Sequence, residues 1–357
     1  MQPLIDPVSL DLIKSELTPD KKLCDTNKGH NELYVFDYIN SPNLMLEVGR
    51  LRELTFREAT AGVGLPYDWD EFDTMEKPYK QIIVWDPDAE AIIGGYRFIL
   101  GPDMAIKEDG QPNIVSSHMF KFSEEFMQNY LPHVMELSRA FVVPAYQSSK
   151  AGAKALYALD NLWDGIGAVI MLHPDIMYFM GKMSMYQTYD PTARELILSY
   201  LWKHFEDKDK LAVALDPVMP QSDPRLVGLI LKDDELKDDY KNLKAAVQAL
   251  GTNIPPMINS YITISPTMKM LGTGINREFG DVLDTGIMIC FNELYEEKRE
   301  RHVKSFIREK TKQLRLRFPN LGDDFEERLA ERWTRRRAKR FAKFHARRQR
   351  KAARKNK

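Results

Sequence analysis

Two strand-like runs joined by a short turn constrain the fold of this chain more than any other feature. Residues 81–85 and 91–100 are rich in β-branched and aromatic side chains, which favour strands. The sequence Asp-Pro-Asp-Ala-Glu between them is typical of a turn. We therefore predict an antiparallel hairpin, and with it a β-sheet in the first third of the chain.

The hairpin belongs to a longer alternation of helix-like and strand-like segments. Apolar residues at helical spacing predict helices over 6–17 and 43–60. The segments predicted after the hairpin are a strand at 135–143, a helix at 150–169, a strand at 176–185, helices at 192–205 and 232–244, and strands near 268–271 and 286–291. This order predicts an α/β protein with a mixed central sheet flanked by helices.

Charge is divided unevenly along the chain. The last 27 residues hold 14 Lys or Arg and one acid, Glu331, although the whole chain has 51 basic and 52 acidic residues. The first 330 residues therefore carry a net charge of roughly −14. A basic tail attracts polyanions, so anionic lipid, an acidic carrier protein and nucleic acid are candidate partners.

The basic tail also has an apolar pattern. Leu329, Trp333, Phe341 and Phe344 fall near one face of a 3.6-residue helix. Basic residues on the opposite face would suit a helix lying in a membrane interface. The alternative is a frayed, solvated end that binds nothing specific.

Several other classes of protein lose their usual sequence support. The longest weakly polar stretch, 165–185, is interrupted by His-Pro-Asp, and acidic residues occupy the start of the chain where a secretory signal would be apolar. We expect a cytoplasmic protein, with peripheral attachment to the inner face of the membrane as a further expectation. Cys24 and Cys290 are too few for a disulfide framework or a zinc site, so no metal is expected.

An ordered set of charged residues runs through the predicted elements. In chain order the set is Arg52, Asp68, Asp70, Asp73, Arg97, Glu136 and Arg139. It resembles the acyl-carrier-protein-dependent branch of the GCN5-related N-acyltransferase (GNAT) fold. That branch includes acyl-homoserine-lactone synthases and the N-acyltransferases of ornithine- and glycine-lipid synthesis. The resemblance covers residues 44–291, about seven tenths of the chain.

The C-terminal half is similar to the amino-lipid enzymes, the hemolysin-like subfamily. It has a proline pair, Pro255 and Pro256, before a short helix, and the turn Glu278, Phe279, Gly280 before the last strand. The resemblance implies an enzyme that moves a 3-hydroxy fatty acyl group from acyl carrier protein to the amine of glycine or ornithine. Alternatives are an acyl-homoserine-lactone-type synthase, or a non-catalytic protein of this fold that binds nucleic acid through its tail.

The chemistry of acyl transfer suggests roles for the charged set. The reaction needs a neutral amine, a stabilised oxyanion and a protonated leaving thiolate. We predict Glu136 as the general base, with Arg139 and Asp73 as further catalytic residues. The backbone N–H groups predicted for the oxyanion hole are those of Ala140, Phe141 and Val142.

Recognition of the acceptor falls to the arginines. A planar guanidinium binds a carboxylate through two hydrogen bonds, so Arg52, Arg97 and Arg139 are candidates for acceptor binding or active-site ordering. Asp70, a further substrate-binding candidate, can hold these guanidinium groups together with Asp73. The alternative is that Glu136, Arg97 and Arg139 form only a structural salt-bridge cluster.

The donor site is predicted from a loop. In the wider fold an Arg/Gln-x-x-Gly-x-Gly/Ala turn at a helix N-terminus holds the pyrophosphate of coenzyme A. The turn here, 147–153, is one residue too long, which agrees with the single phosphate of 4′-phosphopantetheine. We predict Gln147, Lys150 and Gly152 as phosphopantetheine-binding residues. No permanent cofactor is expected, and the donor is acyl carrier protein or acyl-CoA.

These interpretations divide the chain into three parts. Residues 1–42 form a helical N-terminal extension, 43–293 form a GNAT-like acyltransferase domain with an acidic insertion at about 217–250, and 294–357 form a helical basic tail. The expected partners are acyl carrier protein, a small amino acid and an anionic membrane surface. Nucleic acid is the less favoured partner of the tail.

Overall fold

A computed structural model describes residues 1–147, 152–233, 235–318, 322 and 324–355, without the side chains of 152–156 and 351–355. An eight-stranded sheet forms its centre, in the order β1-β2-β3-β4-β6-β7-β10-β9. The strands are β1 (Lys22–Asp25), β2 (Glu32–Phe36), β3 (Lys80–Asp86), β4 (Ala91–Leu100), β6 (Val134–Val142), β7 (Tyr178–Met185), β9 (Lys269–Asn276) and β10 (Val282–Cys290). A second sheet pairs β5 (Phe120–Phe122) with β8 (Ala212–Ala214).

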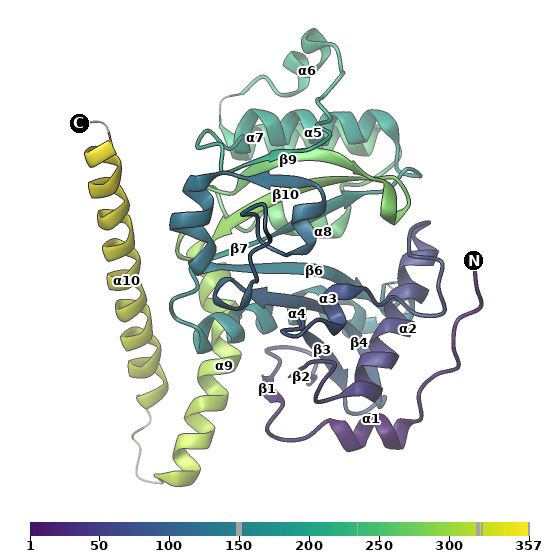
Figure 1. Cartoon of the computed structure of the whole chain (residues 1–357), viewed down its shortest axis with the longest axis vertical. Helices are drawn as coiled ribbons and strands as arrows, with labels where there is room; N and C mark the ends of the chain where they lie inside the picture. The colour runs from purple at the N-terminus through teal and green to yellow at the C-terminus, as the bar shows by residue number, and fades with distance from the viewer. Residues whose placement is uncertain (148–151, 234, 319–321, 323, 356–357) are drawn as a thin grey trace.

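Helices cover the sheet (Figure 1). They are α1 (Leu10–Glu16), α2 (Pro42–Glu58), α3 (Glu71–Thr74), α4 (Gly152–Leu172), α5 (Pro191–Phe205), α6 (Pro224–Ile230), α7 (Leu236–Ala249), α8 (Pro256–Ile262), α9 (Glu296–Arg317) and α10 (Phe325–Lys355). The predicted hairpin is confirmed, since β3 and β4 pair antiparallel from Lys80 opposite Phe98 to Asp86 opposite Ala91. The mixed α/β class is confirmed as well.

The N-terminal extension differs from the prediction. Residues 1–42 contain α1, but they also supply β1 and β2, and β2 pairs antiparallel with β3. The extension is therefore part of the sheet, and a boundary at residue 42 separates no independent unit. Strands of four and five residues are too short to show a clear alternation in the sequence.

The sheet opens between β6 and β7. All other neighbouring strands are antiparallel, whereas β6 and β7 are parallel and pair only over Val134–Glu136 and Tyr178–Met180. Both strands continue beyond that point, β6 to Val142 and β7 to Met185. We call the region between residues 137–142 and 181–185 the β6–β7 wedge.

A β-bulge bends β6 beside the wedge. In the β4–β6 ladder Gly95 pairs with Phe141, and the next pair is Arg97 with Ser138. One residue of β4 lies between these pairs but two residues of β6 do, so β6 has one extra residue. Arg139 lies in this bulge with φ of 52°, a left-handed conformation that few side chains adopt. A bulge re-aims the side chain at that position, so Arg139 can leave the ordinary alternation of the strand.

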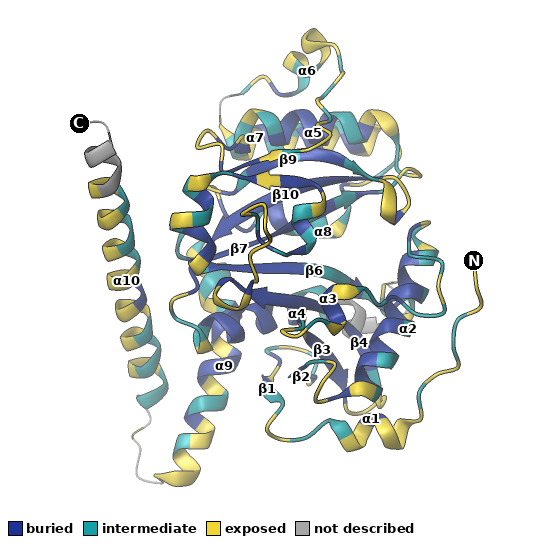
Figure 2. Ribbon diagram, viewed as in Figure 1, coloured by how far each residue is buried: buried dark blue, intermediate teal, exposed yellow. Residues whose placement is uncertain are grey.

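The basic tail packs against the body of the protein. Trp333 contacts the ring of Phe291 at a centroid distance of 6.2 Å, and Phe344 lies 6.0 Å from Tyr178. Between them Arg337 is buried, and its Nε donates to Asn292 at 2.9 Å. The predicted amphipathic helix is present, but its apolar face is covered by the protein rather than free for a membrane. The outer side of α10 is exposed (Figure 2).

The acidic insertion, residues 217–250, packs against α5. It contains α6 and α7. Asp239 on α7 is buried, and its carboxylate accepts from Lys203 at 2.7 Å and lies 2.8 Å from His204 on α5. The predicted surface helix at 232–244 therefore docks on the body of the protein through Asp239 and through buried Leu243, and Val247 later in α7 is buried as well. Among the described helices, none combines the length and apolar character needed to cross a membrane.

Candidate active site

A one-turn helix positions two of the predicted aspartates. Asp70 caps α3 by accepting from the backbone N–H of Phe72 at 3.0 Å, and Asp73 accepts from the N–H of Asp70 at 3.2 Å. This reciprocal arrangement is a capping box. It fixes both carboxylates on the side of α3 that faces β4 and α2.

Two arginines meet these aspartates in the interior. Arg52 on α2 binds both oxygens of Asp73, at 2.7 and 3.3 Å, and Arg97 on β4 binds both oxygens of Asp70, at 2.5 and 2.6 Å. Arg97 also lies 2.8 Å from Asp73 and donates to Ser138 at 2.9 Å. Both guanidinium groups have no exposed surface. In this arrangement both groups are shielded from solvent, and their predicted part in acceptor binding or site ordering stays a prediction.

Arg139 is the arginine of the set that reaches the surface. Its side chain is 16% exposed, its Nε lies 3.0 Å from Asp68, and its Nη2 lies 3.6 Å from Asp70. Its guanidinium also lies over the ring of Phe279, 4.6 Å from the centroid. Asp68 further pairs with Arg52 at 3.3 Å. We call Arg52, Arg97, Arg139, Asp68, Asp70 and Asp73 the arginine–aspartate cluster.

Burial and pairing act in opposite directions on the cluster. Burial acts to raise the pKa of Asp73, but the charges of Arg52 and Arg97 outweigh it and hold that pKa well below its usual range. The pKa of Asp70 is likewise lowered, against burial, by Arg97. The pKa of Arg97 is raised well above its usual value by both aspartates, despite burial. Asp70, Asp73 and Arg97 therefore stay ionised at neutral pH.

Glu136 stands apart from the cluster. Its carboxylate is buried and accepts from the hydroxyl of Tyr79 and from the N–H of Ser116 at 2.8 Å. Burial and the Glu136 charge raise the pKa of Tyr79 well above its usual value, so the phenol remains a donor. The structure does not test the predicted base role. It shows that the carboxylate has no exposed surface and is covered by Tyr79 and by the turn Val115–His118 (η2), so an amine can reach it only if part of this cover moves.

Three of the remaining predicted residues lie along the wedge. Ala140, Phe141 and Val142 follow the last β6–β7 pair, and Phe141 and Val142 pair with β4 on their other side. Gln147 donates through its side chain to the carbonyl of Val142 at 2.6 Å. Gly152 begins α4, and Lys150 lies outside the described residues. Their roles in oxyanion and phosphopantetheine binding stay predictions.

Two residues that the sequence reasoning missed lie near this site. His118 is 43% exposed and lies 3.7 Å from Glu71 and 3.4 Å from Glu278. Lys182 on β7 lies 3.0 Å from Asp284 on β10. A lysine in an otherwise apolar interior strand is a signal that the sequence offered, whereas nothing near His118 in the sequence marks it.

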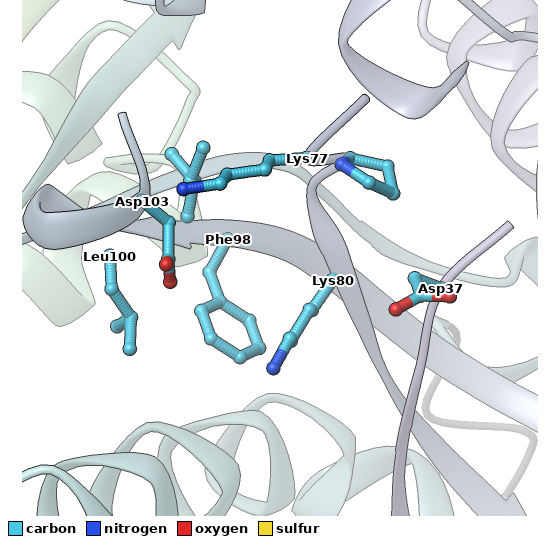
Figure 3. A pocket seen from close by; sticks show the side chains of 8 residues that line it. Asp37, Lys77, Lys80, Phe98, Leu100 and Asp103 are labelled. Atoms are coloured by element: carbon cyan, nitrogen blue, oxygen red, sulfur yellow. The ribbon is translucent and has the colours of Figure 1, made fainter. Parts of the chain in front are cut away.

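Figure 3 shows a cavity of about 240 Å³. Its lining residues are Asp37, Lys77, Pro78, Lys80, Phe98, Ile99, Leu100 and Asp103. They come from β3, β4 and nearby loops, and none was predicted as a site residue. Among the described residues there is also no group of three or more His, Cys, Asp or Glu that could hold a metal ion.

Comparison with known proteins identifies relatives of this chain. A family model described as an acetyltransferase (GNAT) domain matches residues 51–157. The chain is 49% identical over 316 residues to a glycine N(alpha)-acyltransferase of Phocaeicola vulgatus, covering 88% of this chain and 97% of that protein. It is 51% identical over 308 residues to a glycine N(alpha)-acyltransferase of Bacteroides thetaiotaomicron, covering 86% and 91%.

The chain belongs to the GNAT family of acyltransferases. The predicted family resemblance and the prediction that the protein is an enzyme are thereby confirmed. A solved CoA-dependent acyl-homoserine lactone synthase, BjaI, with SAM and isopentyl-CoA, is 18% identical and covers 46% of this chain and 72% of that one. Its TM-score of 0.26 is too low to support any argument about this site.

Proposed function

We propose that this acyltransferase moves a 3-hydroxy fatty acyl group from acyl carrier protein to the amine of glycine, as a step of amino-lipid biosynthesis. The observation that carries the proposal is the extent of the match to two proteins named glycine N(alpha)-acyltransferase, which spans 86–88% of this chain. A match of that extent supports the same acceptor. Ornithine is the second acceptor to be tested.

The arrangement of the site supports this reaction. A thioester arm between β6 and β7 would present its carbonyl to the backbone of Ala140, Phe141 and Val142, the predicted oxyanion hole. Arg139 is partly exposed beside it and can bind the acceptor carboxylate, while Arg52 and Arg97 hold the aspartates that orient it. Opening of η2 would bring Glu136 to the amine as general base.

Carrier protein as the donor is also part of the proposal. The loop 147–153 carries one residue more than a coenzyme A turn, which supports a donor with a single phosphate. A competition experiment tests this choice, with the acyl carrier protein thioester and acyl-CoA of the same chain length present in one reaction. We expect the carrier protein thioester to be consumed first, and preferential use of acyl-CoA would refute this part.

The basic tail is proposed to attract the enzyme to an anionic membrane surface. Because the apolar face of α10 packs on Phe291 and Tyr178, only the basic outer side of this helix can contact the membrane surface. The attraction would therefore be electrostatic, without insertion, and would fall with salt.

Purified enzyme with 3-hydroxyacyl carrier protein and each amino acid tests the main proposal. Mass spectrometry should find N-acylglycine as the dominant product. An absence of any N-acyl amino acid would contradict the proposal, and release of methylthioadenosine from S-adenosylmethionine would favour a homoserine-lactone-type synthase instead.

A further inference from the structure

A lysine interrupts an apolar strand where β6 and β7 separate. The ammonium of Lys182 lies 3.0 Å from Asp284, and its side chain is 13% exposed. Asp284 is itself buried, and it also accepts from Ser184 and, at 2.8 Å, from Asn276. Asp284 therefore holds the ammonium in one place while three donors satisfy the carboxylate.

The register of the sheet places Lys182 at the wedge. Glu136 is opposite Met180 in the last β6–β7 pair. Side chains alternate along a strand, so Lys182, two residues further, projects from the same face as Met180 and Glu136. At about 3.3 Å per residue it lies roughly 7 Å beyond that pair. The backbone of Lys182 thus lies beside the unpaired part of β6, at the space that the proposed function gives to the thioester. Its ammonium leans toward Asp284 on β10 and lies 3.6 Å from Sδ of Met119.

The other cations near the wedge are poorly suited to give up a proton there. Arg52 and Arg97 are sealed from solvent and bound to aspartates. Arg139 is partly exposed, but a guanidinium does not release its proton in proteins. His118 lies between two exposed glutamates at the outer side of η2. Lys182 combines a transferable proton, a fixed position and limited contact with solvent.

We propose that Lys182 is the general acid of the reaction, donating a proton to the departing thiolate. This inference rests on the proposed function. The amine nitrogen forms a bond to the thioester carbonyl carbon, the carbon–sulfur bond breaks with its electron pair on sulfur, and the Lys182 ammonium protonates that sulfur. The proton lost by the amine goes to the base, and Lys182 regains a proton from solvent. Asp284 is a positioning residue that holds the ammonium.

The test varies the leaving group. The wild-type enzyme, Lys182→Arg and Lys182→Gln are compared with two donors that carry the same acyl chain, acyl-pantetheine and the acyl thioester of 4-nitrothiophenol. An aryl thiolate departs readily without a proton. Arginine keeps the ion pair with Asp284 but cannot transfer the proton, so with acyl-pantetheine we expect Lys182→Arg to lose about 10²-fold in kcat. With the aryl thioester we expect a loss of less than roughly fivefold.

The ratio of the two rates is the deciding number, because it is independent of the fraction of enzyme that is folded. Lys269→Met is the matched control. Lys269 lies on β9, the edge strand of the sheet, and makes a similar ion pair with Asp207 at 3.1 Å. An equal loss with both donors, or full activity of Lys182→Arg with acyl-pantetheine, would overturn the proposal. Failure of the wild-type enzyme to acylate glycine from acyl carrier protein would instead refute the proposed function.

Discussion

The arginines of the sheet and the arginines of α10 are the same chemical group in opposite surroundings. In the arginine–aspartate cluster three guanidinium groups meet three carboxylates, and two of the three arginines have no exposed surface. On α10 most of the described basic side chains are exposed, and its described ion pairs reach Asp324, Asp175 and Glu125. The paired charges of the cluster fix the positions of its side chains, whereas the unbalanced positive charge of α10 can attract anions from a distance.

Because of this difference, we expect the loss of a cluster arginine and the loss of an α10 arginine to change different properties of the protein. A buried charge that loses its partner stays in a medium that solvates it poorly, so its loss is felt in folding. An exposed charge is already solvated, so its loss changes the free energy of unfolding little and mainly weakens the binding of anions. The four predictions below test that separation.

The largest effect is expected at Arg97. Replacing Arg97 with Met leaves buried Asp73 and partly buried Asp70 without their shared cation, and we expect a loss of about 3–5 kcal/mol in the free energy of unfolding. Urea denaturation measures it. Arg332→Met, on the exposed side of α10, is the control and should change stability by less than about 0.5 kcal/mol. Equal losses in both variants would remove the distinction between the two regions.

Reversing charge on α10 should affect membrane binding and leave folding alone. Arg335, Arg336 and Lys339 are exposed, and each basic residue near an anionic surface contributes about 1 kcal/mol. Their triple change to Glu should weaken binding to phosphatidylserine vesicles by at least about 10²-fold in a co-sedimentation assay at low salt. The charge-preserving variant with Lys, Lys and Arg at these positions should bind normally. Unchanged binding of the Glu variant would argue against the tail's proposed role.

The apolar side of α10 gives a third prediction. Phe344→Ala removes a ring that contacts Tyr130, Tyr178 and His133, and we expect a loss of about 1–3 kcal/mol in the free energy of unfolding. Phe318→Ala is the control, since Phe318 is 53% exposed. A tail that only frays in solvent would show no difference between the two variants.

The smallest effect concerns pH. The pKa of Asp70 is lower in the folded chain than in the unfolded one, so its contribution to stability is complete above the unfolded pKa of about 3.9 and is lost as pH falls towards the folded pKa. Asp70→Asn removes that titration. Below pH 4 the stability of the variant should therefore fall less steeply, by up to about 1.4 kcal/mol per pH unit. Parallel pH curves for the two proteins would show that Asp70 has no special environment.

Much of the fold was readable because its determinants are local. The hairpin of β3 and β4, the helix α2 and the strand β6 follow from spacing of apolar residues and from turn residues that lie within a few positions of one another. The capping box of α3 is likewise local, and its aspartates were singled out in the sequence. The short strand β2 was missed because its partner β3 lies more than 40 residues away, and β1 was missed with it because β1 pairs with β2.

The sequence by itself determined the α/β class, the charged set and the amphipathic character of the tail. Only the tertiary structure decided what each charge faces. It buried Arg52 and Arg97, left Arg139 partly exposed on a bulge, enclosed Glu136 under η2, and turned the apolar side of α10 towards Phe291. The physical reason is that a charge is defined by its partners and its solvent, and both are supplied by segments far apart in the chain.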